Sequence, residues 1–320
     1  MSQVETHPSA GSNVDLSIVI VNWNTRDLLV QCLHSIQHDR LAQQRLTLEV
    51  IVVDNGSGDG SVQVVRRQFP EVRVMENLKN AGFARANNQA IAASRGRYIL
   101  LLNSDTRVIR GALSSLLEFM EDHPDAGGAG ARVLNPDGTL QVSCFPFPTL
   151  SREFWYLLHL DLVWPYAEYR MARWEQDTAR FVDVLLGACL MLRRESLGQV
   201  GSLDEDFFMY SEEVDLCYRL HKAGWRLYWV PEAEVVHYGG QSTKQAAEEM
   251  FLQLYRSKVM FFRKHYGNRW ANLYKAILFI SSLPRVALAL PGRLAPHDYR
   301  ARFRKTAANY RQLLQTLPHF

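Results

Sequence analysis

Residues Tyr98–Thr106 read YILLLNSDT. Ile99–Leu102 form an uninterrupted apolar run, the pattern of a strand buried on both faces inside a parallel sheet. The run stops abruptly at three polar residues, Asn103-Ser104-Asp105. Because open α/β sheets bind ligands beyond the carboxyl ends of their strands, this pattern predicts a ligand site here. A carboxylate at that place can hold a hard cation, which can hold a diphosphate; the alternative is an ordinary polar loop.

The segments on either side of this strand, from residue 16 to residue 122, alternate between two patterns. Apolar runs predict strands, and amphipathic stretches predict helices. The strands are expected at 16–21, 48–53 and 72–75, and the helices at 26–38, 62–69, 83–94 and 110–122. Ser61 is suited to cap the second helix. The alternation indicates an α/β fold with a mostly parallel, doubly wound sheet. No GxGxxG or P-loop pattern supports a dinucleotide fold or a P-loop kinase.

The second half of the chain is less regular. Further strands are expected at 127–134, 182–192, 225–230 and 234–237. Residues 145–180 are aromatic and without clear periodicity, which is typical either of a binding loop or of irregular core packing. Ser211 is a suitable N-cap for a helix that starts with Glu212 and Glu213 and stops at Gly224.

The positive charge of the chain gathers at its end. After residue 255 there are 13 Lys and Arg and one acidic residue, Asp298, a net charge of +12; the preceding part has 23 basic and 32 acidic residues, a net charge of −9. This asymmetry predicts a basic helical extension that works against an anionic surface. Ala276–Leu290 is apolar, but Pro284 and Arg285 interrupt it, and it is shorter than the roughly 20 residues that span a bilayer. We expect it either to lie in a membrane interface or to dock on the body.

The remaining bulk features indicate an ordinary intracellular globular protein. Hydrophobic residues make up 47% and charged residues 22% of the 320 residues, as in globular domains. The four cysteines show no metal-ligand spacing and are expected to be small buried hydrophobes in a reducing cytosol: Cys32, Cys144, Cys189 and Cys217. The polar start lacks a signal sequence and is expected to be disordered. The expected boundaries are therefore a leader at 1–14, an α/β domain at 15–242 and the extension at 243–320.

Acidic and imidazole side chains fall at the expected strand ends and helix starts. They are Asp54, Asp105, the acidic members of Glu212-Glu213-Val214-Asp215, and His237. Each has a simpler alternative as a turn former, a helix-dipole residue or a satisfied histidine. Together, at the carboxyl edge of one sheet, they predict a site that binds a nucleotide diphosphate through a metal and supplies a base.

Seven collinear strings make the sequence recognisable. They cover residues 16–242 and read SIVIVNWN, VIVVDNGSGDGS, NAGFARANNQAI, YILLLNSDT, GARVLNPDGTLQ, LGACLMLRRESLGQVGSLDEDFFMYSEEVDLCYRL and AGWRLYWVPEAEVVHYGGQS. On these strings the sequence resembles the family 2 glycosyltransferases of the GT-A fold, in particular their bacterial rhamnosyltransferase-like branch. The resemblance implies a doubly wound mixed sheet with a C-terminal helical extension.

The resemblance also implies roles for the polar residues. Asp54 would contact the base of the donor nucleotide, within a set of donor-binding residues that also contains Asn22, Asn24, Asn55, Ser57, Asn80, Asn103 and Asp105. Asp105 would ligate Mg²⁺ or Mn²⁺ with His237 nearby, while Asn103 stands where the family has the first Asp of its DxD motif and brings no charge. The pair Glu212-Glu213 matches the family's Glu-Asp pair, whose second member is the catalytic base. Whether Glu213 or Asp215 is the base stays open.

The implied activity is an inverting sugar transfer from a nucleotide-diphosphate donor. Similarity favours dTDP-rhamnose as donor, with UDP-sugars next, and a glycan or polyprenyl-lipid-linked acceptor in cell-surface polysaccharide synthesis. The protein would be cytoplasmic and peripheral on the inner face of the cell membrane, held through its basic tail, with no nucleic-acid partner. The alternatives are a catalytically inactive nucleotide-sugar-binding module and a structural protein of the membrane surface. A nucleotidyltransferase is less favoured, because Asn22-Trp23-Asn24 follows the first strand in place of a Gly-rich phosphate loop.

Overall fold

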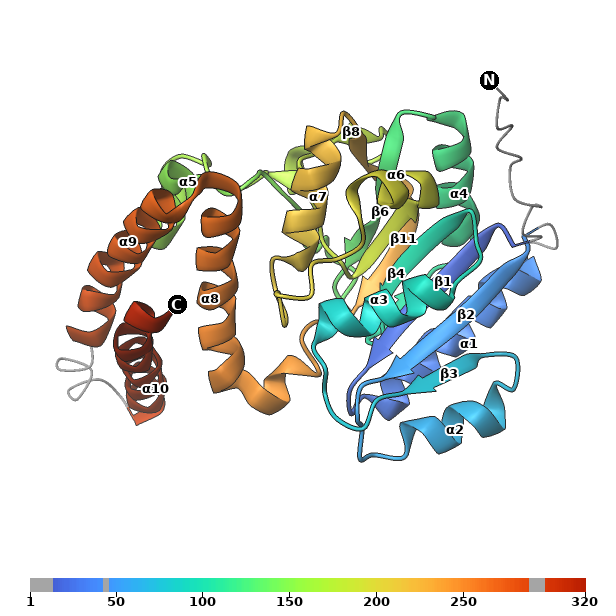
Figure 1. Cartoon of the computed structure of the whole chain (residues 1–320), viewed down its shortest axis with the longest axis horizontal. Helices are drawn as coiled ribbons and strands as arrows, with labels where there is room; N and C mark the ends of the chain where they lie inside the picture. Colours follow the sequence, from blue (N-terminus) through green and yellow to red (C-terminus); the bar gives the residue numbers. More distant parts are fainter. Residues whose placement is uncertain (1–13, 43–45, 288–296) are drawn as a thin grey trace, which may run out of the picture.

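The described residues between 14 and 242 build a mixed β-sheet between two layers of helices (Figure 1). The computed structural model describes residues 14–42, 46–287 and 297–320, so the expected leader lies outside the described residues except for its last position. The strand order is β3-β2-β1-β4-β10-β6-β11-β5, and β8 pairs with β11. The strands of this sheet are β1 (Leu16–Asn22), β2 (Leu48–Asp54), β3 (Arg73–Glu76), β4 (Tyr98–Asn103), β5 (Thr106–Val108), β6 (Ala126–Leu134), β8 (Arg180–Phe181), β10 (Cys189–Arg193) and β11 (Arg226–His237).

Helices cover both faces of this sheet. The helices of the α/β part are α1 (Arg26–Ala42), α2 (Ser61–Gln68), α3 (Phe83–Ala93), α4 (Ala112–Asp122), α5 (Leu150–Leu157), α6 (Arg194–Val200) and α7 (Glu212–Lys222). A second, two-stranded sheet pairs β7 (Cys144–Phe145) with β9 (Val184–Leu185).

Strand β4 lies in the middle of the sheet, as its sequence predicts. It pairs parallel with β1 on one side and antiparallel with β10 on the other. Leu100 belongs to the core cluster that packs against α1 and α4, and Leu101 belongs to the cluster that packs against α3 and α7. Alternate side chains of β4 therefore enter opposite cores, and the predicted burial on both faces is confirmed.

Two strand boundaries differ from the sequence prediction. The run 182–192 is not one strand: a turn at Gly187-Ala188 separates β9 from β10, which belong to different sheets. The runs 225–230 and 234–237 are not two strands but one, β11, whose register against β6 shifts between Val230 and Glu234. This irregularity contains Pro231, which has no amide hydrogen to donate to a neighbouring strand. An apolar pattern predicts neither the turn nor the register shift, because the residues on both sides of each are buried.

The two expected helix caps also differ. Gly60, not Ser61, is the N-cap of α2, and the Ser61 hydroxyl donates to Asp59 at 2.5 Å. Ser211 does occupy the N-cap position of α7, but its side chain accepts no capping hydrogen bond. The four cysteines are free thiols and buried, as predicted.

The aromatic segment 145–180 is partly core and partly exposed. Phe147 and Met171 are buried in the core cluster that contains α7, and Trp174 packs against it. Short 3-10 helices, η1 (Leu160–Leu162) and η2 (Met171–Arg173), interrupt the segment. Trp164, by contrast, is 67% exposed. Irregular core packing thus accounts for part of the segment only.

Three long helices follow the sheet. They are α8 (Ala247–Tyr266), α9 (Asn268–Ala287) and α10 (His297–Thr316), preceded by η3 (Thr243–Ala246) and followed by η5 (Leu317–His319). They pack with α5 around a third cluster that includes Leu157, Val259, Phe262, Tyr274 and Leu313. Helix α9 docks on the body through Ala271, Tyr274, Leu278, Ser281 and Ser282, and 288–290 lie outside the described residues. None of the helices that the structure describes is long and apolar enough to cross a membrane.

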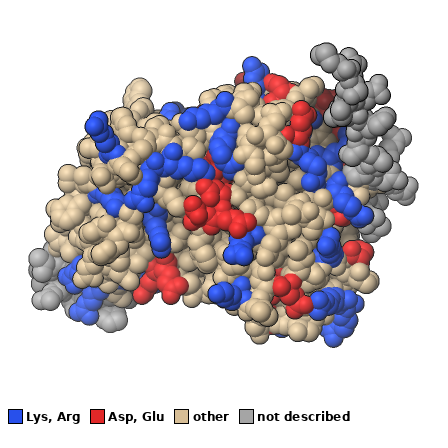
Figure 2. Space-filling model, viewed as in Figure 1, with Lys and Arg blue, Asp and Glu red and all other residues tan. Residues whose placement is uncertain are grey.

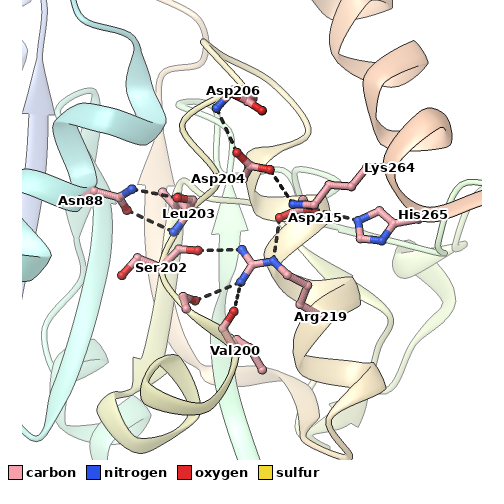
Figure 3. Close-up of polar contacts among 11 residues, drawn as sticks. Asn88, Val200, Ser202, Leu203, Asp204, Asp206, Asp215, Arg219, Lys264 and His265 are labelled. Atoms are coloured by element: carbon pink, nitrogen blue, oxygen red, sulfur yellow. Dashed lines mark hydrogen bonds and ion pairs between the residues drawn. The ribbon is translucent and has the colours of Figure 1, made fainter. Parts of the chain in front are cut away.

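A buried ion-pair network joins α7 to α8 (Figure 3). The Asp215 carboxylate accepts from Arg219 Nε at 2.8 Å and from Lys264 Nζ at 2.7 Å, and His265 Nε2 lies 2.7 Å away. The Asp215 side chain is fully buried. Burial opposes its ionisation, but the hydrogen bonds of His265 and Lys264 and the charge of Arg219 outweigh burial and lower the pKa of Asp215 to about 2. The network therefore favours the ionised carboxylate strongly.

Because of this network, the free energy of unfolding should depend on the negative charge of Asp215, which is present except at acidic pH. Replacing Asp215 by Asn leaves Arg219 without its counter-charge and Lys264 with Asp204 alone, so the free energy of unfolding in urea at pH 7 should fall by about 3 kcal/mol. Because the folded-state pKa is depressed, this contribution is present above the unfolded pKa of about 4 and is lost as pH falls toward 2. The difference between wild type and variant should therefore shrink below pH 4.

The matched control is Asp27→Asn, which breaks an exposed pair with Arg26. It should change the free energy of unfolding by less than about 1 kcal/mol. Equal effects of the two substitutions would contradict the role given to Asp215.

Candidate active site

Parallel pairing brings three polar strand ends together. Asn22 at the end of β1 lies opposite Asp54 at the end of β2, and Val21 lies opposite Asn103 at the end of β4. Since the three strands run in the same direction, their carboxyl ends share one edge of the sheet. The edge predicted from the sequence therefore exists.

Asp54 fixes the loop after β2. It is 4% exposed; Asn22 Nδ2 donates to one carboxylate oxygen at 3.0 Å and the Ser57 amide donates to the other at 2.9 Å. Ser57 Oγ in turn accepts from the Asn24 amide at 2.9 Å. None of these four residues lines the cavity described below. They hold the loop that borders it.

Asn55 and Asn80 reach the cavity itself. Asn55 Nδ2 donates to Asn80 Oδ1 at 2.8 Å, and the Asn80 oxygen also accepts from the Gly82 amide at 3.0 Å. Gly82 has φ of +91°, and a Cβ there would lie 2.7 Å from the carbonyl oxygen of Phe208. Only glycine allows that approach, which brings the 201–211 loop onto the start of α3.

A cavity of about 250 Å³ opens at this edge. Its polar lining includes Asn55, Asn80, Asn103 and Asp105. The sequence analysis did not single out its remaining neighbours, which include Trp23, Phe83, Phe208, Met209 and Gln241. For Trp23, the sequence feature that could have predicted a place in the cavity wall is a flat aromatic residue directly after a strand.

Asp105 and His237 face each other beside this cavity. The β5–β11 pairing brings them together, and His237 Nε2 lies 3.3 Å from Asp105 Oδ1 and from Asn103 Nδ2. His237 Nδ1 lies 2.6 Å from Gln141 Oε1, while the Gln141 amide nitrogen donates to Asn135. Gln141 therefore accepts the Nδ1 proton, and Nε2 faces Asp105, donating to the carboxylate when the ring is protonated and offering a lone pair when it is neutral. The sequence analysis missed Gln141.

This pair has the chemistry of a cation site. Burial opposes ionisation of Asp105, but the hydrogen bond and charge of His237 outweigh burial and lower the pKa of Asp105. A carboxylate oxygen and an imidazole lone pair at 3.3 Å suit a bound cation, and they are ligands that Mn²⁺ accepts. Within the described ranges no group of three His, Cys, Asp or Glu side chains is placed to hold a metal. Asp105 and His237 could thus supply two ligands to a cation, and the oxygens of a bound diphosphate could supply others.

The backbone before Glu212 is in an unusual conformation. Tyr210 and Ser211 have φ of +67° and +65°, although neither is glycine. Each such residue costs on the order of 1–3 kcal/mol, and such strain gathers at functional sites. The two residues lead directly into the first turn of α7, which carries Glu212 and Glu213.

The Glu212 and Glu213 carboxyls are buried and incompletely bonded. In each, the Oε2 atom is inaccessible and has no hydrogen-bond partner. Burial raises the pKa of both, and the charge of Glu213 raises that of Glu212 further. Two adjacent buried carboxyls with raised pKa values favour a single negative charge between them, and Glu213 is the member that lines a cavity.

Glu213 lines a second cavity of about 360 Å³ between α5, α7 and α8. Aromatic and aliphatic side chains form most of the wall; Arg152 and Lys258 also line it, and Lys258 pairs with Glu153 at 2.9 Å. Asp215 lines neither cavity, because it is bound in the α7–α8 network. Two residues apart on a helix, Glu213 and Asp215 point in different directions. The geometry leaves Glu213 open to a ligand and Asp215 closed to one.

Comparison with known proteins agrees with this arrangement. The sequence model described as "Glycosyl transferase family 2" matches residues 17–200. N-acetylglucosaminyl-diphospho-decaprenol L-rhamnosyltransferase of Mycobacterium tuberculosis is 33% identical over 270 residues, which cover 80% of this chain and 86% of that protein. A low-salt glycan biosynthesis hexosyltransferase of Haloferax volcanii is 26% identical and covers 75% of this chain and 72% of its own length.

A solved structure shares the fold. The mannosyltransferase PcManGT from Pyrobaculum calidifontis, in complex with GDP-Man and Mn²⁺, superposes with a TM-score of 0.56 and 17% identity, over 98% of this chain and 88% of that chain. The predicted GT-A fold is confirmed. The family match spans more than half of the chain, and the mycobacterial relative extends the likeness beyond it. The protein is therefore a glycosyltransferase and belongs to family 2 of these enzymes.

Proposed function

We propose that the protein is an inverting enzyme that moves rhamnose from dTDP-rhamnose to a lipid-linked sugar diphosphate in cell-surface polysaccharide synthesis. The observation that carries the proposal is the incompletely bonded Glu213 carboxylate, which faces the second cavity while the segment just before it borders the first. The name of the mycobacterial relative supports both the sugar and the acceptor class. A UDP-sugar is the second candidate donor.

The donor occupies the first cavity in this proposal. Asn55 and Asn80 border the nucleotide, with Trp23 as an apolar wall. Asp54 acts through the loop that it fixes, since both of its oxygens already accept hydrogen bonds. The diphosphate lies toward Asn103 and Asp105 at the other side of the cavity lining.

Asp105 and His237 hold a divalent cation, Mn²⁺ or Mg²⁺. When bound, the cation offsets the charge that develops on the leaving diphosphate. Gln141 fixes the His237 ring with its Nε2 lone pair directed at the site. Asn103 adds no charge, so the carboxylate on this strand end is that of Asp105 alone.

Glu213 acts as general base. It takes the proton from an acceptor hydroxyl, and the acceptor oxygen attacks the anomeric carbon on the face opposite the diphosphate. Inversion follows from attack on that face. Protonated Glu212 beside it avoids a second buried negative charge.

The acceptor enters through the second cavity. Its aromatic wall suits a sugar ring, and Arg152 suits a phosphate group, whereas Lys258 is paired with Glu153. A lipid-linked acceptor places the reaction at a membrane. The net charge of +12 after residue 255 suits the anionic inner face of a cell membrane.

A donor panel tests the function. Purified protein, Mn²⁺ and a GlcNAc-diphospho-lipid acceptor are mixed with dTDP-rhamnose, UDP-sugars or GDP-mannose, and released nucleoside diphosphate is measured. Turnover should be highest with dTDP-rhamnose and should need the acceptor. Faster turnover of a UDP-sugar would reject the donor, and no acceptor dependence would reject the acceptor.

Glu213→Gln should remove the base. We expect kcat to fall about 10²–10⁴-fold, with calorimetric donor affinity unchanged. The raised pKa of Glu213 also predicts that wild-type kcat falls as pH drops through a value above the usual ~4.3 of a glutamate, and that the variant lacks this acid limb. Glu118→Gln, at an exposed position on α4, is the control. A fully active Glu213→Gln enzyme would exclude the base role.

Asp105→Ala should remove metal-dependent donor binding. Donor affinity, measured by calorimetry with Mn²⁺ and with EDTA, should differ strongly for wild type and little for the variant, a loss of about 10–100-fold in the metal-dependent part. Asp122→Ala, at the end of α4, is the control. The assignment fails if the variant keeps the full response to Mn²⁺.

A further inference from the structure

One side of α9 is apolar and exposed. Its other side carries Tyr274 and Leu278, which are buried in the cluster with α5, α8 and α10. Four of the exposed residues are spaced by three, seven and three positions and the fifth adjoins one of them, so they share one side of the helix. They are Trp270 (49% exposed), Leu273 (53%), Phe279 (48%), Ile280 (62%) and Leu283 (46%). Helix α9 is therefore apolar on both sides, although only one side is packed by the described residues.

A second exposed apolar group begins beside the end of this helix. Arg285 of α9 donates to the carbonyl oxygen of Leu157 and lies 3.1 Å from His159 Nε2. The residues that follow are Leu162, Val163 and Trp164, exposed by 89%, 82% and 67%. The exposed apolar residues of α9 and of 162–164 are together called the apolar end.

Basic residues outnumber acidic ones on the helices that carry or adjoin the apolar end. Helix α9 contains Arg269, Lys275 and Arg285 and no acidic residue. Helix α10 exposes Arg304, Lys305 and Arg311. Figure 2 shows mostly uncharged surface over α9, bordered by blue Lys and Arg side chains. The combination is an apolar centre with a basic rim.

This charge decides which partner fits. A second copy of the chain would bring two segments of net charge +12 together, which is unfavourable. An anionic lipid surface supplies both the opposite charge and an apolar layer. Tryptophan side chains such as Trp164 and Trp270 favour the boundary between water and lipid.

We propose that the apolar end seats the protein on an anionic lipid surface, with α9 lying in the plane of the headgroups. Helix α5 links this surface to the second cavity, because Tyr156 and Leu157 line the cavity while Phe154 and Leu158 are exposed. The cavity that holds Glu213 is therefore kept close to the lipid. Only this link to the acceptor rests on the proposed function; lipid binding does not.

Vesicle co-sedimentation of the full chain tests the proposal. The vesicles contain phosphatidylcholine and phosphatidylglycerol in equal parts, or phosphatidylcholine alone. Binding to the mixed vesicles should be about tenfold stronger or more, and should weaken as salt rises. The double variant Ile280→Asp/Leu283→Asp should bind the mixed vesicles about tenfold more weakly or worse.

The matched control is Leu78→Asp, at a fully exposed leucine in the loop between β3 and α3. It should bind the mixed vesicles like wild type, and circular dichroism should show that all variants are folded. Unchanged binding of the double variant, or equal binding to both vesicle types, overturns the proposal. Light scattering that finds a wild-type dimer and a monomeric double variant overturns it too, in favour of a second copy. A failed donor panel with intact vesicle binding would reject the proposed function and leave the lipid surface standing.

Discussion

The burial of β4 on both faces constrains the rest of the structure. Its side chains enter two cores that helices from opposite sides complete, so no polar residue is accommodated before Asn103. Parallel pairing with β1 then fixes where the strand ends relative to Asn22 and Asp54. The polar groups of the first cavity are therefore placed by hydrophobic burial and strand register, and their own hydrogen bonds refine an edge that already exists.

Periodicity was enough to predict most helices and strands of the α/β part. A continuous apolar run such as Ile99–Leu102 has one favourable environment, and the helices carry clear apolar faces. The insertion of β10 between β4 and β6 in the antiparallel sense could not be predicted, since an apolar run carries no direction. The turn at Gly187-Ala188, which separates β9 from β10, could not be predicted from the apolar run either.

The sequence predicted which residues belong to the candidate site better than it predicted the contacts among them. Asp105 and His237 do meet, but Gln141, which orients the imidazole, lies 96 positions from His237 and has no local signature. Asp54 has the expected location, yet neighbouring donors occupy both of its oxygens. Sequence alone left Glu213 and Asp215 equivalent, because the partners that separate them, Lys264 and His265, come from a helix about 50 residues later.

The segment from Phe208 to Glu213 borders both cavities. Phe208 and Met209 line the first, whereas Tyr210, Ser211 and Glu213 line the second. Its carbonyl groups are tied to α3 through the Phe83 amide and to α8 through the Ser257 hydroxyl. With two strained residues at its centre, this segment has little freedom to move one end alone. Under the roles proposed for the two cavities, a substitution at Phe208 or Met209 that changes the donor also shifts Glu213, so selectivity for the donor and reactivity toward the acceptor are inherited together.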